Sequence, residues 1–337
     1  MTAPVAINAR AAVRSQIGGV ERVARELARE LPALNPGRYR VIAPRPALAH
    51  RRGHAWEQLA LPALSRGSRV ILSPANMAPV ASRRSVVFIH DVAPFLGEWY
   101  SPTYSRWHRV LSPLIARRAL LVITISQVSR DQIVQHLGVD PARVAVAALG
   151  VDDRFRDPTG ADAVRGRYGL ERPYVLAVGT DLPRKNLALL DRLAPSLGDR
   201  GLDVVLAGST RPYMPEGSYR ARSLGYVAEE DLPALYAGAA ALAMPSLHEG
   251  FGLPVLEAMA AGAPVVSSNR GALPETCGDA ALVVDPDDEE AFGAALVRAA
   301  TDQEQRARLV AAGRERAAAF TWRRTAERVD ALLDPLL

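Results

Sequence analysis

Short runs of apolar residues, many of them β-branched, alternate with helix-length segments along the first half of the chain. In GVERVARELARELP (residues 19–32) apolar side chains recur every three or four positions, the spacing of an amphipathic helix. Strands are predicted at six runs: PVAINA (4–9), YRVIAP (39–44), RVILSP (69–74), SVVFIHD (85–91), LLVITIS (120–126) and RVAVAAL (143–149). This alternation of strands and helices predicts a mostly parallel α/β sheet.

The second half of the chain repeats the same rhythm. Strands are predicted at YVLAVG (174–179), DVVLAG (203–208), AAALAMPS (239–246), PVVSSN (264–269) and ALVVD (281–285), with helix-length segments between them. This pattern indicates a second doubly wound domain. Ligands of such folds bind at the carboxyl ends of the strands, so two domains in series would form a binding cleft between them.

A segment rich in turn formers and charges separates the two halves. It is ALGVDDRFRDPTGADAVRGRYGLERP (148–173), and the chain of 337 residues is longer than one hydrophobic core usually fills. We expect an N-terminal domain over residues 1–155 and a C-terminal domain over 156–318. A closing helix over 319–337, with Thr321 as its N-cap, would pack back across the domains.

Composition narrows the class of protein. Apolar residues make up 49% of the chain and charged residues 23%, which is typical of a globular protein. The formal net charge is +5, but the arginines are dispersed among the acids, so we expect no nucleic-acid partner. No apolar run is long enough to span a bilayer, and the lone Cys277 excludes an internal disulfide. A buried, inert thiol in a cytoplasmic protein is the expectation.

The segment MPSLHEGFGLPVLEAMAAGAPVV (244–266) carries the strongest chemical signal. Its order is a strand, a glycine-containing loop and a helix, with Pro254 in the first helical turn and Gly262 as a left-handed stop after Ala261. Such a helix start suits a phosphate or another anion. The backbone amides expected to be free donors are those of Gly252, Leu253 and Val255.

Two glutamates flank this helix start. Glu249 precedes the glycines, and Glu257 is expected in the first helical turn. Carboxylates beside a phosphate site are unfavourable unless they accept hydrogen bonds from hydroxyl groups, which a sugar would provide. For Glu257 the alternative is a stabilising interaction of an acid with the helix dipole.

The loop VGTDLPRKNL (178–187) contains Lys185, the only lysine among 41 Lys and Arg residues. This near-total use of arginine indicates a GC-rich coding bias, so the lysine is either an accident or kept for function. Together with Arg184 it would neutralise two adjacent phosphates from different directions. The alternative is a solvated loop in which two basic residues have no specific role.

Five segments together resemble the glycosyltransferase family 4 enzymes, particularly bacterial mannosyltransferase-like members. They are VGTDLPRKNL, HEGFGLPVLEAMAAGAPVVSSNRGALPE, GGVERVARELARELP, VVFIHDVAPF and ITISQVSRDQIVQHLGV. The resemblance covers nearly the whole chain and implies the GT-B fold, in which two Rossmann-like doubly wound domains face each other across a cleft.

The resemblance also implies an activity. It is retaining transfer of a hexose from a nucleotide diphosphate sugar to an acceptor hydroxyl, with no required metal or other cofactor. GDP-mannose is favoured mildly as donor over UDP- and dTDP-sugars, and the acceptor would be a glycan, a lipid-linked molecule or a small molecule. The rivals are a non-catalytic sugar-nucleotide-binding protein and an NAD-dependent oxidoreductase. The latter lacks its G-x-G-x-x-G signature after any predicted strand.

By this resemblance, Arg184 and Lys185 would bind the diphosphate, Glu249 the transferred sugar and Glu257 the ribose. His90 and Asp91 complete the expected catalytic residues, although a structural histidine and a turn-capping aspartate are the alternatives. The remaining donor-binding residues implied are Gly18, Gly19, Gly179, Gly225, Val227, Gly250, Phe251, Gly252 and Leu253.

The aromatic and basic segment EWYSPTYSRWHRVLSPLIARR (98–118) has three interpretations. Its aromatic residues, Trp99, Tyr100, Tyr104 and Trp107, would line an acceptor groove, contact a membrane surface peripherally, or form part of the core. The sequence alone leaves the three open.

Overall fold

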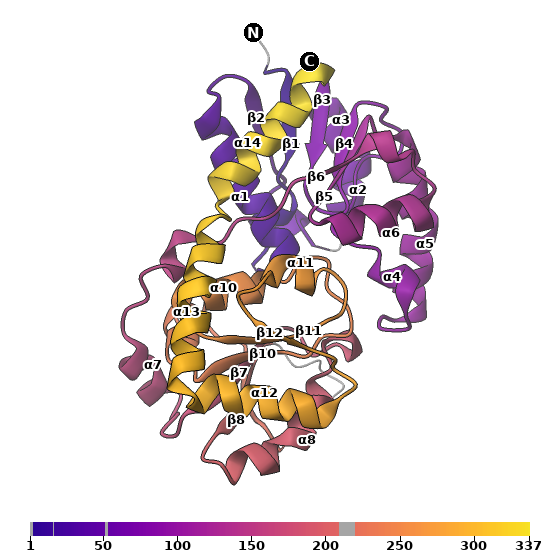
Figure 1. The fold of residues 1–337 in the computed structure, drawn as a ribbon. Helices are drawn as coiled ribbons and strands as arrows, with labels where there is room; N and C mark the ends of the chain where they lie inside the picture. Colours follow the sequence, from indigo (N-terminus) through magenta and orange to yellow (C-terminus); the bar gives the residue numbers. More distant parts are fainter. Residues whose placement is uncertain (1–2, 16, 51–52, 209–219) are drawn as a thin grey trace. The chain divides into compact units, whose positions relative to one another are not determined.

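The chain divides into two compact units. The computed structural model describes residues 3–15, 17–50, 53–208 and 220–337 (Figure 1). Unit 1 comprises Met1–Gly150 and Trp322–Leu337, and unit 2 comprises Val151–Thr321. The chain passes between the units twice. The two crossing points lie beside each other, because Val151 forms a parallel bridge with Thr321 and donates its N–H to the Phe320 carbonyl at 3.2 Å. These crossings fall at 150/151 and 321/322, where the sequence pattern suggested 155/156 and 318/319.

Unit 1 contains a six-stranded sheet in the order β2-β1-β3-β4-β5-β6, and every neighbouring pair is parallel. Each strand predicted in the first half is therefore confirmed. The strands are β1 (Val5–Asn8), β2 (Tyr39–Ile42), β3 (Val70–Ser73), β4 (Ser85–Phe88), β5 (Leu121–Thr124) and β6 (Val144–Val146). The helices are α1 (Gly19–Leu34), α2 (Gly53–Ala55), a π-helical segment (Trp56–Ala60), α3 (Leu61–Leu64), α4 (Ala93–Leu96), α5 (Pro102–Arg118), α6 (Gln127–Leu137) and α14 (Trp322–Leu333).

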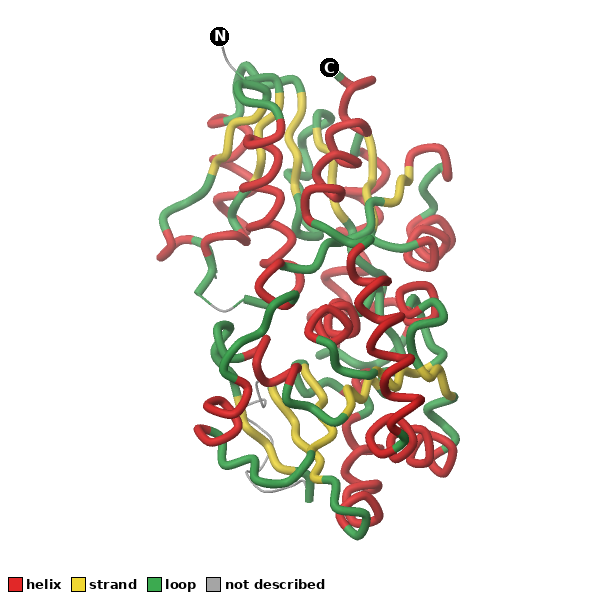
Figure 2. The backbone as a smooth tube through the Cα atoms, turned by 60° about the vertical axis from the view of Figure 1, so that its left-hand side comes forward, coloured by secondary structure: helices red, strands yellow, loops and turns green. Residues whose placement is uncertain are grey.

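Helices lie beside the sheet of unit 1 (Figure 2), and a buried apolar core lies between sheet and helices. Val87 of β4, Val122 of β5 and Val144 of β6 pack against Ile115 of α5 and Ile133 of α6. The predicted closing helix is α14, which packs on α1 within this unit.

Polar contacts hold α14 against the rest of unit 1. Asp330 accepts a hydrogen bond from Asn35 Nδ2 at 2.7 Å and pairs with Arg38 Nε at 3.2 Å. Thr325 donates to the Ala148 carbonyl at 2.8 Å. The last helix of the chain thus completes the first unit.

Unit 2 contains a second six-stranded parallel sheet, in the order β12-β11-β10-β7-β8-β9. Its strands are β7 (Tyr174–Val178), β8 (Asp203–Ala207), β9 (Arg222–Gly225), β10 (Ala241–Met244), β11 (Val265–Ser268) and β12 (Leu282–Val284). Its helices are α7 (Ala161–Arg167), α8 (Leu187–Gly198), α9 (Leu232–Ala237), α10 (Leu253–Ala261), α11 (Leu273–Cys277), α12 (Glu289–Thr301) and α13 (Gln303–Ala318). The sequence pattern missed β9, an edge strand with little burial, and α7, which lies inside the charged segment 148–173.

Helices cover both faces of the unit 2 sheet. Successive strand residues point to opposite faces, and Val175 and Ala177 of β7 pack with Leu189 of α8 and Phe292 of α12. Helix α10 lies on the other face with α13 beside it (Figure 1). Cys277 at the end of α11 is fully buried, as expected, and burial raises the pKa of its thiol to about 11.

The strand orders place a topological switch point in each sheet. In unit 2 the chain moves from β7 to β8 and β9 on one side, and then returns to β10 on the other side of β7. In unit 1 the corresponding point lies between β1 and β3. Loops at the carboxyl ends of these strand pairs are therefore the expected positions for ligands.

Candidate functional site

In unit 2, the loops after β7 and β10 are bonded directly to each other. The Leu247 N–H donates to the Arg184 carbonyl at 2.7 Å, and Asn186 Nδ2 donates to the Pro245 carbonyl at 3.3 Å. Asn186 has the left-handed φ of 52°, which turns the chain from the Arg-Lys pair into α8. The basic loop and the glutamate-glycine loop thus meet at the switch point of unit 2.

Glu249 lies between the two cations. Its Oε1 accepts from Lys185 Nζ at 2.6 Å and from Ser246 Oγ at 2.9 Å, and its Oε2 lies 3.0 Å from Arg184 Nη1. Arg184 also donates to the His248 carbonyl at 2.9 Å. The side chains of Lys185 and Arg184 are only 11% and 13% exposed, so their positive charges are weakly screened by solvent.

The carboxylate is held in its ionised form. Burial by itself would raise the pKa of Glu249, but the nearby Lys185 and Arg184 charges outweigh burial and lower the pKa from 4.5 to about 2. Among the described residues, the ionised Glu249 carboxylate thus lies between the largely buried cations Lys185 and Arg184 at neutral pH. The site can hold a polyanion beside a strong acceptor for hydroxyl groups.

Glycines allow the backbone of this site to pack closely. Gly271 has a φ of 59°, and a Cβ there would lie 2.6 Å from the Glu249 carbonyl oxygen. The neighbouring Ala272 N–H donates to that same oxygen at 2.9 Å. Gly179 has a φ of 149°, and a Cβ there would lie 3.3 Å from Cε of Lys185. The Lys185 side chain therefore passes close to the backbone at Gly179, which follows β7 and has no side chain.

The helix α10 begins at Leu253, and it has Pro254 in its first turn and ends at Ala261 before the left-handed Gly262, the last three features as predicted. One predicted donor is wrong: the Val255 N–H donates to the Gly252 carbonyl at 2.9 Å, because Gly252 adopts the left-handed φ of 103° and the chain turns tightly there. In the described residues, the amides of Gly252 and Leu253 form no such bond.

Glu257 lies in the second turn of α10, not in the first, because the helix starts at Leu253. Its exposure is 4%, and its Oε2 accepts from the Tyr236 hydroxyl of α9 at 2.8 Å. Phe155 packs edge-on against the Tyr236 ring at 5.8 Å. The first-turn dipole interpretation of Glu257 therefore does not apply, and Tyr236 fixes its carboxylate.

The other donor-binding residues expected in unit 2 lie around these loops. Gly250 is buried, and Phe251 is buried against Phe320 with ring centroids 6.0 Å apart. Gly225 ends β9 with a φ of 66°, and Val227 after it is 4% exposed. Gly225 and Val227 therefore lie at the β9 edge of the sheet. In the strand order, β8 and β7 separate this edge from β10, and the loop after β10 holds Glu249.

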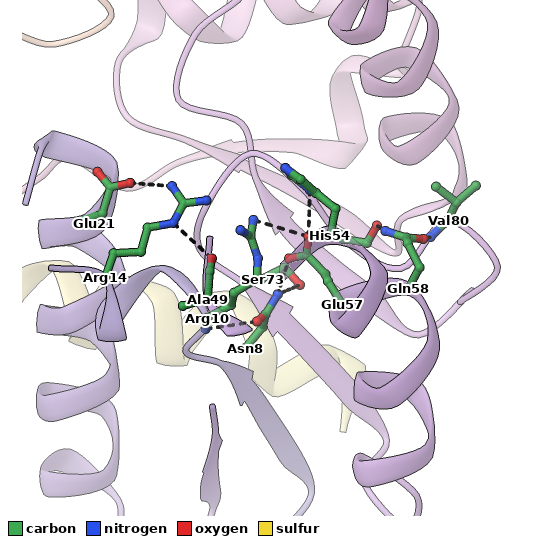
Figure 3. Close-up of polar contacts among 11 residues, drawn as sticks. Asn8, Arg10, Arg14, Glu21, Ala49, His54, Glu57, Gln58, Ser73 and Val80 are labelled. Atoms are coloured by element: carbon green, nitrogen blue, oxygen red, sulfur yellow. Dashed lines mark hydrogen bonds and ion pairs between the residues drawn. The ribbon is translucent and has the colours of Figure 1, made fainter. Parts of the chain in front are cut away.

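In unit 1 the expected glycines lie at the start of α1. Gly18 is the N-cap residue, and Gly19 is the first residue of the helix. Glu21 accepts the Gly18 N–H at 3.2 Å and pairs with Arg14 Nη1 at 2.7 Å (Figure 3). This pairing fixes the loop between β1 and α1 by charged contacts.

His90 and Asp91 follow β4, the neighbour of β3. His90 is 5% exposed, and its Nε2 lies 2.8 Å from the Pro74 carbonyl, which only accepts, so Nε2 carries the proton. Burial lowers the pKa of His90 against the effect of Pro74 and Asp91, which leaves Nδ1 of the neutral ring as an acceptor. Asp91 Oδ1 accepts the Ala93 N–H at 3.0 Å, so Asp91 does cap the following turn.

Three residues of these sites were missed by sequence reasoning. Ser246 supports Glu249, Asn186 joins the two loops, and Tyr236 holds Glu257. Ser246 stands three residues before Glu249, a spacing that suggests a local hydrogen bond. Nothing in the local sequence marks Tyr236, because its partner lies on another helix.

The described residues contain neither a cluster of metal-binding side chains nor a helix that could span a membrane. In the part of the chain that the structure describes, no group of three or more His, Cys, Asp or Glu side chains is placed to hold a metal ion. Within the same ranges, no helix combines the length and apolar character needed to cross a membrane.

Family models match both units. Residues 163–316 match the model described as "Glycosyl transferases group 1", and residues 70–155 match the model described as "Glycosyltransferase Family 4". The first match contains the loops with Lys185 and Glu249, and the second contains His90 and the segment 98–118.

Similar proteins cover most of the chain. The O-antigen chain mannosyltransferase B of Escherichia coli is 34% identical over 82% of this chain and 75% of its own length. The MMP alpha-(1->4)-mannosyltransferase of Mycolicibacterium hassiacum is 32% identical over 70% of this chain and 59% of its own length. The solved structure of Anabaena Alr3699/HepE in complex with UDP has a TM-score of 0.73 at 19% identity, covering 98% of this chain and 99% of that one.

Proposed function

The chain belongs to the group 1, family 4 glycosyltransferases of GT-B fold, and from this premise we propose that it transfers mannose from GDP-mannose to an acceptor hydroxyl, with retention at the sugar carbon. The family fixes the enzyme class and the use of a nucleotide sugar. Mannose as the sugar is supported by the names of the two bacterial relatives above. UDP- and dTDP-sugars are the alternative donors.

A single observation carries this proposal, namely the contact of Glu249 with Lys185 and Arg184 at the switch point of unit 2. The two cations would bind the donor diphosphate and stabilise its charge as the bond to the sugar breaks. Glu249 would then accept hydrogen bonds from the sugar hydroxyls. The amides of Gly252 and Leu253 at the start of α10 would supply further donors to phosphate.

Two further residues would hold the donor and the sugar. Glu257, fixed by Tyr236, would accept hydrogen bonds from the ribose hydroxyls. His90 would accept one sugar hydroxyl at Nδ1, because its Nε2 proton is donated to Pro74. We assign Asp91 a supporting position, since one of its oxygens caps the next turn.

The transfer itself needs no covalent intermediate on the protein. The bond between the sugar carbon and the diphosphate oxygen breaks, the acceptor oxygen bonds to that carbon on the same face, and the acceptor proton passes to the departing diphosphate. The protein contributes orientation of the two substrates and stabilisation of the leaving charge. Lys185 is thus kept for function in a chain whose other basic residues are arginines.

The acceptor would be a glycan or a lipid-linked glycan, and the similarity to an O-antigen chain mannosyltransferase of E. coli supports a glycan. We propose a cytoplasmic location, which the single reduced cysteine fits, with peripheral contact to a membrane through a surface of unit 1.

Release of nucleoside diphosphate from a panel of GDP-, UDP- and dTDP-sugars tests the proposal. We expect release with GDP-mannose, and a loss of about 10²–10³-fold in Lys185→Ala, the magnitude of a lost contact to developing charge. Arg192→Ala is the matched control, because Arg192 is an exposed cation of unit 2 paired with Glu289. Wild-type turnover in Lys185→Ala would refute the assigned role, and binding without release would identify a non-catalytic protein.

A further inference from the structure

The outward face of α5 carries an exposed apolar stripe. It consists of Trp107, Val110 and Leu114, which are 48%, 63% and 36% exposed. Their spacing of three and four residues places them on one side of the helix, whereas Ile115 and Ala116 on the other side are buried in the unit 1 core. A surface helix normally carries polar side chains on its outward face, so this stripe is unusual.

An apolar hollow adjoins the stripe. It has a volume of about 300 Å³, and Met77, Val80, Trp107 and Leu111 are among its lining residues. Gln58 fixes one wall, because its Oε1 accepts the Val80 N–H at 2.8 Å and its Nε2 donates to the Ala78 carbonyl at 3.0 Å (Figure 3). The apolar surface is thus preformed and continues beyond the helix.

Four arginines surround a second hollow at the end of α5. This arginine cluster consists of Arg83, Arg117, Arg118 and Arg143, and its hollow of about 400 Å³ also includes the 39% exposed Leu120. The side chains of the last three donate only to backbone carbonyls. Among the described residues no carboxylate pairs with any of the four.

A hydrogen bond joins the walls of the two hollows. The Val80 carbonyl accepts from Arg118 Nη1 at 3.4 Å, and Val80 lines the apolar hollow whereas Arg118 lines the basic one. Uncompensated arginines beside exposed Trp, Val and Leu side chains form the chemical pattern of a surface that meets the interface of a bilayer.

We propose that this surface, made of the apolar stripe and the arginine cluster, docks on an anionic lipid membrane. The stripe inserts among the acyl chains near the headgroups, and the arginines contact headgroup phosphates. A second copy of the chain fits less well, because a symmetric contact through this surface would bring two clusters of like charge together. This inference names the residues and the class of lipid that would form the peripheral membrane contact proposed above. It rests on the proposed function only for the biological role of that contact.

Binding to vesicles tests the arginine cluster. The full chain is sedimented with vesicles of phosphatidylcholine alone or of phosphatidylcholine mixed with phosphatidylglycerol. We expect binding to the anionic vesicles only, and a loss of about 30-fold in Arg83→Ser/Arg118→Ser, since each arginine near an anionic surface contributes about 1 kcal/mol. The matched control is Arg45→Ser/Arg308→Ser, which removes the same charge from two exposed arginines outside the cluster and should bind as the wild type does.

A second variant tests the apolar stripe. Val110→Ser/Leu114→Ser changes exposed positions, so the fold should be preserved, and we expect vesicle binding to fall at least about tenfold as inserted apolar area is lost. Circular dichroism and GDP binding are measured for every variant. They separate failure of this inference from failure of the proposed function, because nucleotide binding depends on unit 2 residues.

Several outcomes would overturn the inference. They are equal binding to neutral and anionic vesicles, no binding to either, and wild-type binding by both surface variants. Concentration-dependent dimerisation of the wild type that either surface variant abolishes would assign the surface to a second copy instead. The inference would be supported if added salt weakens vesicle binding steeply in proteins with an intact arginine cluster and not in Arg83→Ser/Arg118→Ser.

Discussion

Replacing Glu249 with glutamine keeps the size of the side chain and removes the negative charge that contacts both Lys185 and Arg184. In the wild type, the pKa of Glu249 is lowered from 4.5 to about 2. At about 1.4 kcal/mol per pKa unit, the folded site favours the ionised carboxylate by about 3 kcal/mol. Loss of one partner from a buried ion pair costs about 3–5 kcal/mol, which agrees with this value.

We therefore expect Glu249→Gln to unfold at a lower temperature than the wild type. For a unit of this length, residues 151–321, about 3 kcal/mol corresponds to a decrease of about 6–12 °C in the Tm of unit 2. Because the folded pKa lies below the unfolded value, the wild type has this stabilisation above pH 4.5 and loses it as the pH falls toward about 2. The difference between the two proteins should shrink over that acid range.

The same substitution should strengthen binding of the nucleotide alone. In the wild type the diphosphate competes with Glu249 for the two cations, and each hydrogen bond to a charged group contributes about 1.5–3 kcal/mol. We expect GDP to bind Glu249→Gln about 10- to 100-fold more tightly by calorimetry, and to raise its Tm by more than that of the wild type. Sugar transfer and discrimination among donor sugars should be lost.

The control is Glu289→Gln, which removes the same charge from an exposed pair with Arg192 and should cost less than about 1 kcal/mol. An unchanged Tm at neutral pH in Glu249→Gln, or GDP affinity no higher than that of the wild type, would refute the charge-balance reasoning.

The other predictions concern three residues around the site. Tyr236→Phe removes the hydrogen bond to Glu257 and should raise the donor KM about tenfold with little change in kcat, and an unchanged KM in steady-state titrations would contradict the positioning role. Gly271→Ala places a Cβ 2.6 Å from the Glu249 carbonyl at a φ of 59°, so activity should fall at least about tenfold and stability by about 1–3 kcal/mol in denaturant unfolding. Cys277, with its pKa raised to about 11, should react with a thiol reagent at pH 8 only after unfolding, and rapid labelling of the native protein would disprove its burial.

Much of the fold follows from local sequence pattern. Every predicted strand run contains a strand, and the α10 boundaries at Leu253 and Gly262 agree with the proline and glycine signals. The exceptions have local reasons as well. The edge strand β9 buries too little to give an apolar run, and α7 has a short helical pattern among charges.

Parts of the site depended on tertiary structure. The free amide predicted for Val255 is bonded to Gly252, because the conformation of the preceding glycine decides where the helix starts. Tyr236 reaches Glu257 only because α9 packs against α10. For Trp107 in the segment 98–118 the core interpretation does not hold, since its side chain is 48% exposed and the buried face of α5 is the one that carries Ile115.

The sequence by itself determined all the strands except β9, most of the helices, the basic loop and the glutamate-glycine loop, because periodicity, glycine and proline act over a few residues. Only the tertiary structure decided that Glu249 lies between Lys185 and Arg184, and that Arg83 and Arg143 gather with Arg117 and Arg118 at the end of α5. Both arrangements depend on which strands are neighbours in a parallel sheet. That choice is made by packing between residues far apart in the chain, and local pattern does not encode it.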